Sequence, residues 1–155
     1  MKRMRKLIAA TACALAFGAA GLAQAQNQQG WSYAYTEGVA TATQRDDRGR
    51  VTATFTCRPP TGDIIVTDYS FNQQRLRRVS SAAVTLGNLT VNVPATVEGR
   101  GRQARLVINL PQRPPLLAGA QERDIVTVTV NNQAHAYQAG SAMRLKEVAY
   151  ACWGG

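Results

Sequence analysis

The sequence predicts a mostly β domain: an antiparallel β-sandwich or half-open barrel with a short C-terminal helix that a disulfide ties to a core strand. Three observations support this prediction. Apolar and polar residues alternate along many short segments separated by turn residues, which is the period-two pattern of strands. The last segment, from residue 141, changes to helical spacing. One cysteine lies on the apolar face of a strand and another on that of the helix.

The first 25 residues are predicted to be a cleaved export signal, which leaves residues 26–155 as a single β-rich domain. Four basic residues and no acidic one occupy the first six positions, and an apolar run too short to span a bilayer comfortably follows. Ala23-Gln24-Ala25 is a small-x-small cleavage site, which makes Gln26 the expected N-terminus. These features indicate a bacterial Sec-type signal and a periplasmic or secreted protein.

A lipid anchor is the alternative for the same segment. Ala10-Thr11-Ala12-Cys13 resembles a lipoprotein box, in which Cys13 would carry the lipid. The apolar stretch before Cys13 is very short and a better cleavage site follows it, so we favour cleavage after Ala25. No other segment is long and apolar enough to cross a membrane, so no transmembrane segment is expected in the mature chain.

Cleavage also changes the charge of the protein. The whole chain has 18 basic and nine acidic residues, for a net charge of +9. The signal removes four basic residues, which leaves 14 against nine and a net charge of +5. All but one of the remaining basic residues are arginine. An exported protein rarely meets nucleic acid, so we expect no nucleic-acid partner and instead an anionic envelope component or an acidic protein.

The first half of the domain reads as four strands, predicted at residues 31–35, 39–43, 50–57 and 64–71. The third is the clearest, because its apolar residues alternate with threonines and Cys57 falls on the apolar face. Two prolines end it, since proline cannot donate to a strand ladder. In the first strand, Trp31, Tyr33 and Tyr35 share one face, which is expected to pack on the core, with a binding strip as the less favoured alternative.

The second half begins with a hairpin. Residues 82–86 and 89–93 flank Gly87-Asn88, a dipeptide typical of two-residue hairpin turns. Pro94 is then expected to end that strand or to confine it to a sheet edge. Further elements are predicted as strands at 103–110, 125–130 and 134–138 and one or two helical turns at 116–122.

The C-terminal segment is predicted to be a helix. Its apolar residues follow i, i+3, i+4, i+7 spacing, which places Leu145, Val148, Ala149 and Cys152 on one face. Ser141 precedes this stripe and is expected to cap the helix, because its hydroxyl can accept a hydrogen bond from an orphan backbone N–H.

Cys57 and Cys152 are predicted to form a disulfide between the third strand and the helix. Export favours the bond, because the periplasm and the exterior are oxidising. Two buried free thiols are the alternative. A catalytic dithiol is not expected, since redox pairs usually lie close in sequence as C-x-x-C. The few possible ligands show no metal-site spacing, so no metal and no cofactor is expected.

His135 is the single histidine and therefore the candidate for a general base. It lies in an alternating segment without a glycine elbow or a neighbouring nucleophile, so a half-exposed strand residue is the preferred interpretation. The carboxylates are dispersed along the chain and indicate no catalytic pair. We therefore expect a protein that is not an enzyme, with a small hydrolase built on His135 as the less favoured alternative.

Two clusters of arginine are the candidate contacts with an anion or a partner. The first comprises Arg75, Arg77 and Arg78, and the second Arg100, Arg102 and Arg105. If the two connections share one end of the domain, six guanidinium groups converge there, and guanidinium suits bidentate contact with phosphate or carboxylate. Two independent solubilising loops are the preferred interpretation, and convergence is the alternative.

The spacing of several residues resembles that of known small exported proteins. The shared features are an early Trp31, a strand ending in Cys57, a Pro/Leu-rich segment with Leu116-Leu117-Ala118, a strand pair, and Gly140-Ser141-Ala142 before Val148 and Cys152. The pattern is similar to proteobacterial proteins of the invasion-associated locus B type and to periplasmic accessory proteins of type VI secretion. This resemblance implies a β-sheet core with a C-terminal helix and no catalytic residues.

A second likeness is to periplasmic inhibitors of c-type lysozyme, which also have a strand ending in Cys and a C-terminal Cys. Their inhibitory loop is rich in Ser and Gly, and Arg100-Gly101-Arg102 is its nearest counterpart here.

The expected function is a non-enzymatic periplasmic or secreted binding or accessory protein that engages an envelope component or a protein partner. A periplasmic enzyme inhibitor is the alternative.

Overall fold

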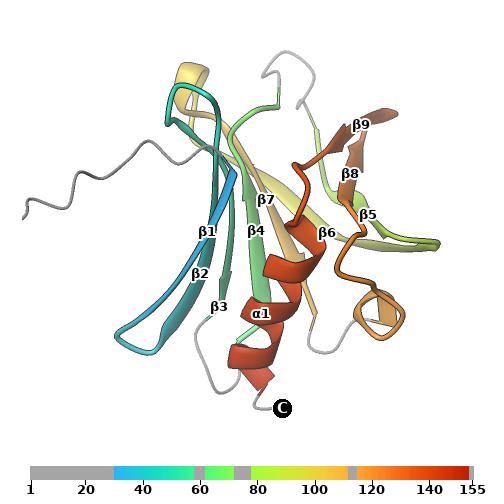
Figure 1. Ribbon diagram of the computed structural model, residues 1–155. Helices are drawn as coiled ribbons and strands as arrows, with labels where there is room; N and C mark the ends of the chain where they lie inside the picture. Colours follow the sequence, from blue (N-terminus) through green and yellow to red (C-terminus); the bar gives the residue numbers. More distant parts are fainter. Residues whose placement is uncertain (1–29, 58–61, 72–77, 112–114, 154–155) are drawn as a thin grey trace, which may run out of the picture.

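The computed structural model describes residues 30–57, 62–71, 78–111 and 115–153 (Figure 1). These residues form nine strands, two short 3-10 helices and one α-helix. In chain order they are β1 (Gly30–Thr36), β2 (Val39–Arg45), β3 (Val51–Cys57), β4 (Ile64–Asp68), β5 (Ser81–Leu86), β6 (Leu89–Glu98), η2 (Gly101–Gln103), β7 (Arg105–Leu110), η3 (Pro115–Leu117), β8 (Val126–Val130), β9 (Gln133–Ala136) and α1 (Ser141–Trp153).

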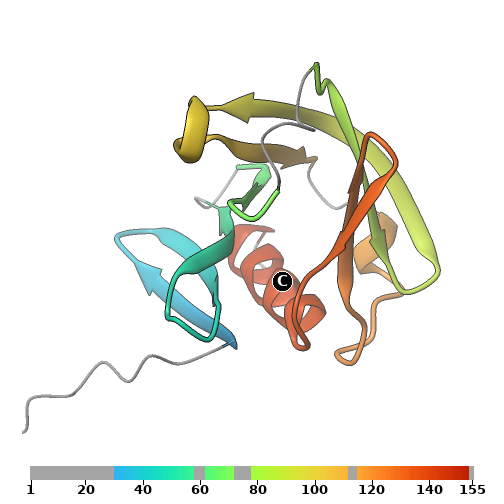
Figure 2. The ribbon, with the colours of Figure 1, turned by 90° about the horizontal axis from the view of Figure 1, so that it is seen from above.

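The nine strands form one antiparallel sheet that curls into a half-barrel. Their order in the sheet is β1-β2-β3-β4-β7-β6-β5-β8-β9, and each pair of neighbours is antiparallel. Figure 2 shows the sheet wrapping around α1, which lies at the opening between the β1 and β9 ends. The predicted mostly β class is confirmed, and of the two architectures considered the structure is the half-open barrel.

The alternating residues of the strands build the core on the concave side of the sheet. In β3, Ala53, Phe55 and Cys57 are buried and the threonines between them are partly exposed, as their spacing predicted. The helix packs chiefly against β2 and β3. The inward residues of β2 include Ala40 and Ala42, and such small side chains let a helix approach the sheet closely.

The predicted helix is confirmed as α1, with its apolar stripe buried. The capping role predicted for Ser141 is wrong, because Ser141 is itself the first helical residue. Its buried hydroxyl oxygen accepts a hydrogen bond from the Val126 N–H at 2.9 Å, which ties the start of α1 to the start of β8. No helix within the described ranges is long and apolar enough to cross a membrane.

Strand β6 runs through Pro94, so the prediction that this proline ends the strand is wrong, whereas the alternative of an edge position holds locally, because Pro94 itself is paired with β5 alone. Residues 89–94 of β6 pair with β5, and residues 95–98 pair with β7. The Ala95 N–H donates to the Ser80 carbonyl at 3.1 Å on the β5 side. Since successive N–H groups alternate in direction, the N–H that Pro94 lacks would face β7, where pairing begins one residue later.

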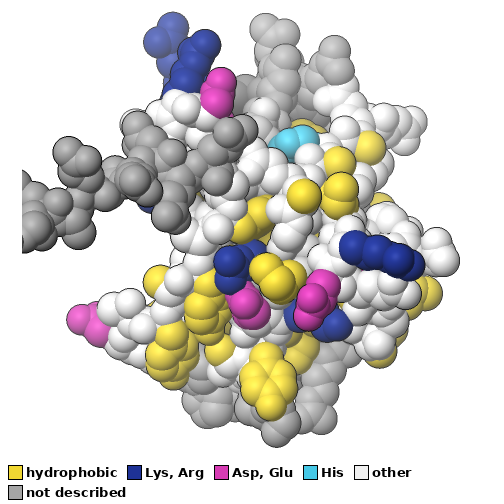
Figure 3. Space-filling view, viewed as in Figure 1, with side chains coloured by type: hydrophobic (Ala, Val, Ile, Leu, Met, Phe, Trp, Pro, Cys, Tyr) yellow, Lys and Arg dark blue, Asp and Glu magenta, His cyan; other side chains and the backbone are white. Residues whose placement is uncertain are grey.

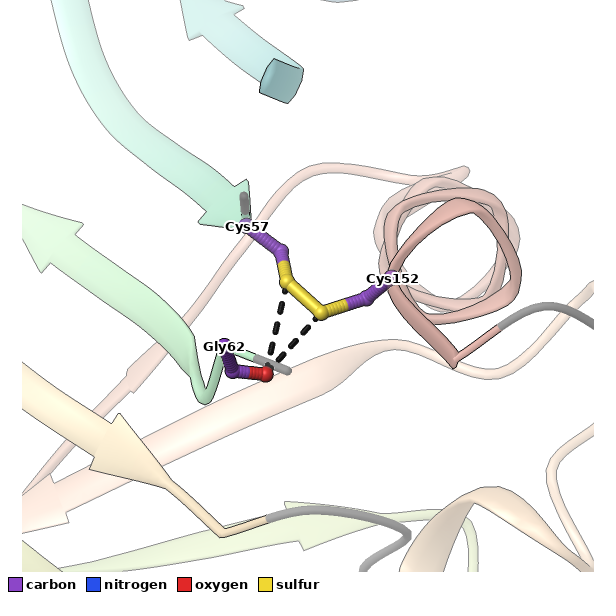
Figure 4. Close-up of a disulfide and its surroundings, with 3 residues drawn as sticks. All are labelled: Cys57, Gly62 and Cys152. Atoms are coloured by element: carbon purple, nitrogen blue, oxygen red, sulfur yellow. Dashed lines mark hydrogen bonds between the residues drawn. A yellow bond between two sulfur atoms is a disulfide. The ribbon is translucent and has the colours of Figure 1, made fainter. Parts of the chain in front are cut away.

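A disulfide joins Cys57, at the end of β3, to Cys152 near the C-terminal end of α1, as predicted. Their Cα atoms are 5.7 Å apart, and both residues are buried. The Gly62 carbonyl oxygen lies 3.4 Å from Cys57 Sγ and 3.0 Å from Cys152 Sγ (Figure 4). Because a disulfide sulfur carries no proton, these are S···O contacts. The bond fixes the helix to β3, and its two sulfur atoms contact the segment that leads into β4.

Candidate functional site

A hydrogen bond between Asp68 and His135, which is an ion pair when the imidazole is protonated, joins two walls of the half-barrel. Asp68 is the last residue of β4, in the middle of the sheet, and His135 lies in β9 at one end of the strand order. His135 Nδ1 is 2.8 Å from Asp68 Oδ2. The curl of the sheet brings these two distant strands together, because β4 and β9 are not neighbours in the sheet.

Ser70 completes this cluster from the segment that follows β4. Its backbone N–H and its hydroxyl both donate to Asp68 Oδ1, at 2.7 and 2.6 Å. Ser70 Oγ also lies 3.1 Å from His135 Nδ1 and 3.4 Å from Nε2. The Asp68 carboxylate thus accepts three hydrogen bonds, which offset the cost of its complete burial. We call Asp68, Ser70 and His135 the clasp.

The contacts within the clasp set its charges. Burial by itself raises the pKa of Asp68, but the hydrogen bonds from His135 and Ser70 outweigh it and hold the pKa below the ordinary 3.8. The hydrogen bond to Asp68 raises the pKa of His135 above the ordinary 6.5, against the opposing effect of burial. The carboxylate is therefore ionised at neutral pH, and the imidazole is charged to a greater extent than that of a free histidine.

Aromatic rings surround the clasp. Phe71 and Tyr137 each pack edge-on against His135, with ring centroids 5.6 and 5.2 Å away. Tyr137 also packs edge-on against Trp31 and Phe55, and these two rings stack with centroids 4.5 Å apart. Burial, together with the nearby carboxylate, raises the pKa of Tyr137 well above 10.0, so its hydroxyl is neutral. The pair thus lies partly among aromatic rings, where Coulomb attraction to the protonated imidazole is stronger than in water.

The clasp does not have the arrangement of a catalytic triad. In a triad, the serine hydroxyl meets the imidazole nitrogen that the carboxylate does not hold. Here the Ser70 hydroxyl donates to Asp68, and Ser70 Oγ lies closer to Nδ1, the nitrogen that Asp68 already holds. The serine proton is directed away from His135. Within the described residues, Nε2 has only the 3.4 Å approach of Ser70 Oγ.

The sequence identified His135 but not its partner. His135 is half-exposed in a strand, as expected, with 33% of its side chain accessible. Asp68 continues the alternation of Ile64 and Val66, which are buried. A carboxylate on the inward face of a strand is rare unless it is paired, and that signal could have singled out Asp68. The partner, 67 residues away in sequence, follows only from the curl of the sheet.

In the second arginine cluster, one arginine forms an ion pair and the other two form none within the described residues. Arg105 is not free, because its guanidinium pairs with Glu98 across the β6–β7 ladder at 2.8 Å. Arg100 and Arg102 are exposed on the turn that carries η2 and have no ion-pair partner within the described residues. Two of the three guanidinium groups are therefore available to a partner.

Of the first arginine cluster, Arg75 and Arg77 lie outside the described residues. Arg78 is exposed just before β5. Ser81 pairs with Pro94, so β5 begins beside the part of β6 that leads up to η2. The start of β5, next to Arg78, and η2 both lie toward the upper end of the half-barrel in Figure 1. The described parts of the two clusters share one end of the molecule, and contact with a partner there stays a prediction.

Within the described parts of the chain, no three His, Cys, Asp or Glu residues lie close enough together to hold a metal ion. No family model matches the chain, and comparison with curated proteins and with solved structures found no significant similarity.

Proposed function

We propose that the protein is an exported, non-enzymatic binding or accessory protein that engages an anionic envelope component through the arginine-bearing upper end. The observation that carries this proposal is the pair Arg100 and Arg102, exposed on one turn and free of ion pairs within the described residues. Their neighbour Arg105 shows the contrast, because Glu98 already neutralises it. An unpaired guanidinium is well suited to phosphate and carboxylate groups.

The turn that carries these arginines is tightly folded. Gln103 N–H donates to the Arg100 carbonyl at 3.2 Å, and Ala104 N–H donates to the Gly101 carbonyl at 3.1 Å. Gly99 has a φ of +79°, and a Cβ there would lie 2.5 Å from the Gln103 carbonyl oxygen. Only glycine fits this position. A constrained backbone holds the two guanidinium groups in a limited set of positions, which reduces the entropy lost on binding.

The substitution Arg102→Glu is expected to weaken binding to vesicles that contain phosphatidylglycerol. A basic residue near an anionic surface contributes about 1 kcal/mol, and reversing its charge adds a similar repulsion. The expected loss of about 2 kcal/mol is roughly thirtyfold in affinity. Cosedimentation at low and high salt measures it, and the melting temperature should not change, because Arg102 is exposed.

The matched control is Arg123→Glu, which makes the same change in charge on an exposed residue before β8, beside the β5–β6 turn and so at the end of β6 away from η2. It should reduce affinity much less than Arg102→Glu. Equal losses in both variants would mean that overall charge, and not the turn around η2, governs binding. Absence of salt-sensitive binding by the unmodified protein would refute the anionic envelope component as its ligand.

A small hydrolase that uses His135 is the second candidate, and the clasp is the observation that favours it. A carboxylate on Nδ1 leaves Nε2 as the nitrogen that could take a proton from water. The test is hydrolysis of p-nitrophenyl acetate by the protein and by His135→Gln, against free imidazole at the same concentration. We expect no rate above that of imidazole. A faster rate that His135→Gln loses would support the hydrolase instead.

The proposal also requires export, and mass spectrometry of the protein from its native host tests this requirement. The mature chain is expected to begin at Gln26 and to be two hydrogens lighter than the reduced chain, because Cys57 and Cys152 are joined. A chain that begins at a lipidated Cys13 would replace the soluble binding protein with an anchored one. Retention of residues 1–25 would contradict the proposed export, and with it the expected periplasmic or secreted location.

A further inference from the structure

Strand β1 has one free edge. Among the described strands it pairs only with β2, at the end of the sheet. The two strands are joined by the two-residue turn Glu37-Gly38, in which both φ angles are positive, at 52° and 76°. In such a hairpin the closing pair is hydrogen-bonded, and the bonded pairs then alternate along the ladder. The backbone N–H and C=O groups of Tyr33 and Tyr35 therefore point away from β2.

This edge lacks the features that usually protect an edge strand. Natural edges carry charged residues, proline or a bulge, which prevent another strand from pairing. β1 reads GWSYAYT, with no charge and no proline, and its register with β2 is continuous. The opposite edge strand, β9, has four residues against seven in β1, and the clasp holds it against β4. The unprotected edge is therefore that of β1.

The edge lies beside a shallow hollow of about 300 Å³ between β1 and α1. It is lined by Tyr33, Glu147, Tyr150 and Ala151. Tyr150 is 71% exposed, and Tyr35, further along β1, is 57% exposed, so part of the aromatic face predicted to pack on the core remains open. Figure 3 shows apolar side chains gathered on the lower part of this face. A strand added to β1 would continue the curl of the sheet over this side of α1.

We propose that the β1 edge receives an extended segment of a protein partner, which pairs with Tyr33 and Tyr35 and places a large apolar side chain in the hollow. The row of unpaired backbone groups fixes the chemistry of the occupant, since only another extended chain matches it. Glu37, exposed at the tip of the hairpin, has no ion-pair partner within the described residues. The partner segment therefore carries a basic residue at the end that lies beside Glu37.

A second copy of this chain fits the edge less well than such a segment. The copy would bring another β1 strand, which has no basic residue to place beside Glu37. Each mature chain also has a net charge of +5, so two copies repel each other. This surface is separate from the arginine-bearing end, and neither proposal depends on the other.

To test the proposal, peptides that bind the full mature protein are selected from a random phage-displayed library. Enriched peptides, made synthetically, are expected to bind the protein and Tyr35→Ala with similar affinity and to lose at least tenfold on Tyr35→Pro. Proline at position 35 removes an outward N–H without removing a bond to β2, and alanine retains that N–H. Hydrogen exchange at Tyr33 and Tyr35 should be fast in the free protein and slow with peptide bound.

A second variant keeps the proposal testable if Tyr35→Pro does not fold. Tyr150→Glu changes an exposed helix residue and places a charge in the hollow, so the melting temperature should remain within a few degrees while peptide binding falls. Peptides that bind Tyr35→Pro and Tyr150→Glu as well as the unmodified protein would overturn the proposal. So would a library that yields no peptide, or a dimer in light scattering that Tyr35→Pro dissociates, since the occupant would then be a second copy.

Discussion

Replacing both Cys57 and Cys152 with alanine is expected to lower the free energy of unfolding by about 4–5 kcal/mol. The disulfide links residues 95 apart in sequence, so it removes much of the freedom of the unfolded chain. The chain-entropy relation gives about 4.7 kcal/mol for a loop of roughly that length. A small domain is typically stable by only about 5–15 kcal/mol, so this loss leaves a marginal fold. Equilibrium unfolding in urea without reductant measures the difference.

The reduced protein supplies the control for the disulfide prediction. Since both sulfur atoms are buried, the double alanine variant loses some packing in addition to the cross-link. The unmodified protein under strong reductant should therefore fall between the oxidised protein and the double variant. If reduction leaves the urea midpoint unchanged, the bond contributes nothing to stability, and the unfolded state must already be compact.

The sequence pattern predicted the place of a residue correctly wherever that place depends only on the strand, helix or turn that contains the residue. The alternation that ends at Cys57 and the helical stripe that ends at Cys152 each placed one cysteine inward, and the disulfide followed from the two together. The hairpin at Gly87-Asn88 was likewise predicted from its two residues and is present as a turn between β5 and β6. These features depend on period and turn chemistry, which are local.

The predictions failed where a residue's role is decided by a distant strand. Pro94 was expected to end β6 or to confine it to a sheet edge, but β6 continues, because the missing N–H faces the side on which β7 is not yet paired. Ser141 was expected to cap its own helix and instead binds the backbone of Val126. Asp68 and His135 looked unrelated, since their contact exists only because the sheet curls. The half-barrel, rather than any motif, assembles the clasp.

The clasp is expected to be the other large contributor to stability. Removing one partner of a buried ion pair costs about 3–5 kcal/mol, because the remaining charge is left unpaired in apolar surroundings. The substitution His135→Ala leaves the fully buried Asp68 carboxylate with Ser70 alone. We expect a loss of about 3 kcal/mol, at the lower end of that range, since one third of the His135 side chain is exposed.

A second substitution that restores stability separates the effect of the unpaired Asp68 charge from the effect of lost packing. His135→Ala combined with Asp68→Asn should be more stable than His135→Ala alone, because the amide carries no charge and still accepts from the Ser70 N–H. Urea unfolding of the two single variants, the double variant and the unmodified protein measures the coupling. If the double variant is as unstable as His135→Ala, the loss comes from packing against Phe71 and Tyr137 rather than from the unpaired carboxylate.

The contribution of the clasp should depend on pH with a maximum between roughly pH 4 and 6.5. The lowered pKa of Asp68 gives stability that is present above the ordinary value of 3.8 and is lost as pH falls through the folded-state pKa. The raised pKa of His135 gives stability that is complete below 6.5 and is lost as pH rises through the folded-state pKa. The difference in unfolding free energy between the unmodified protein and the Asp68→Asn, His135→Ala variant should follow this curve. A difference that is constant from pH 4 to 9 would show that the two side chains interact without net charge.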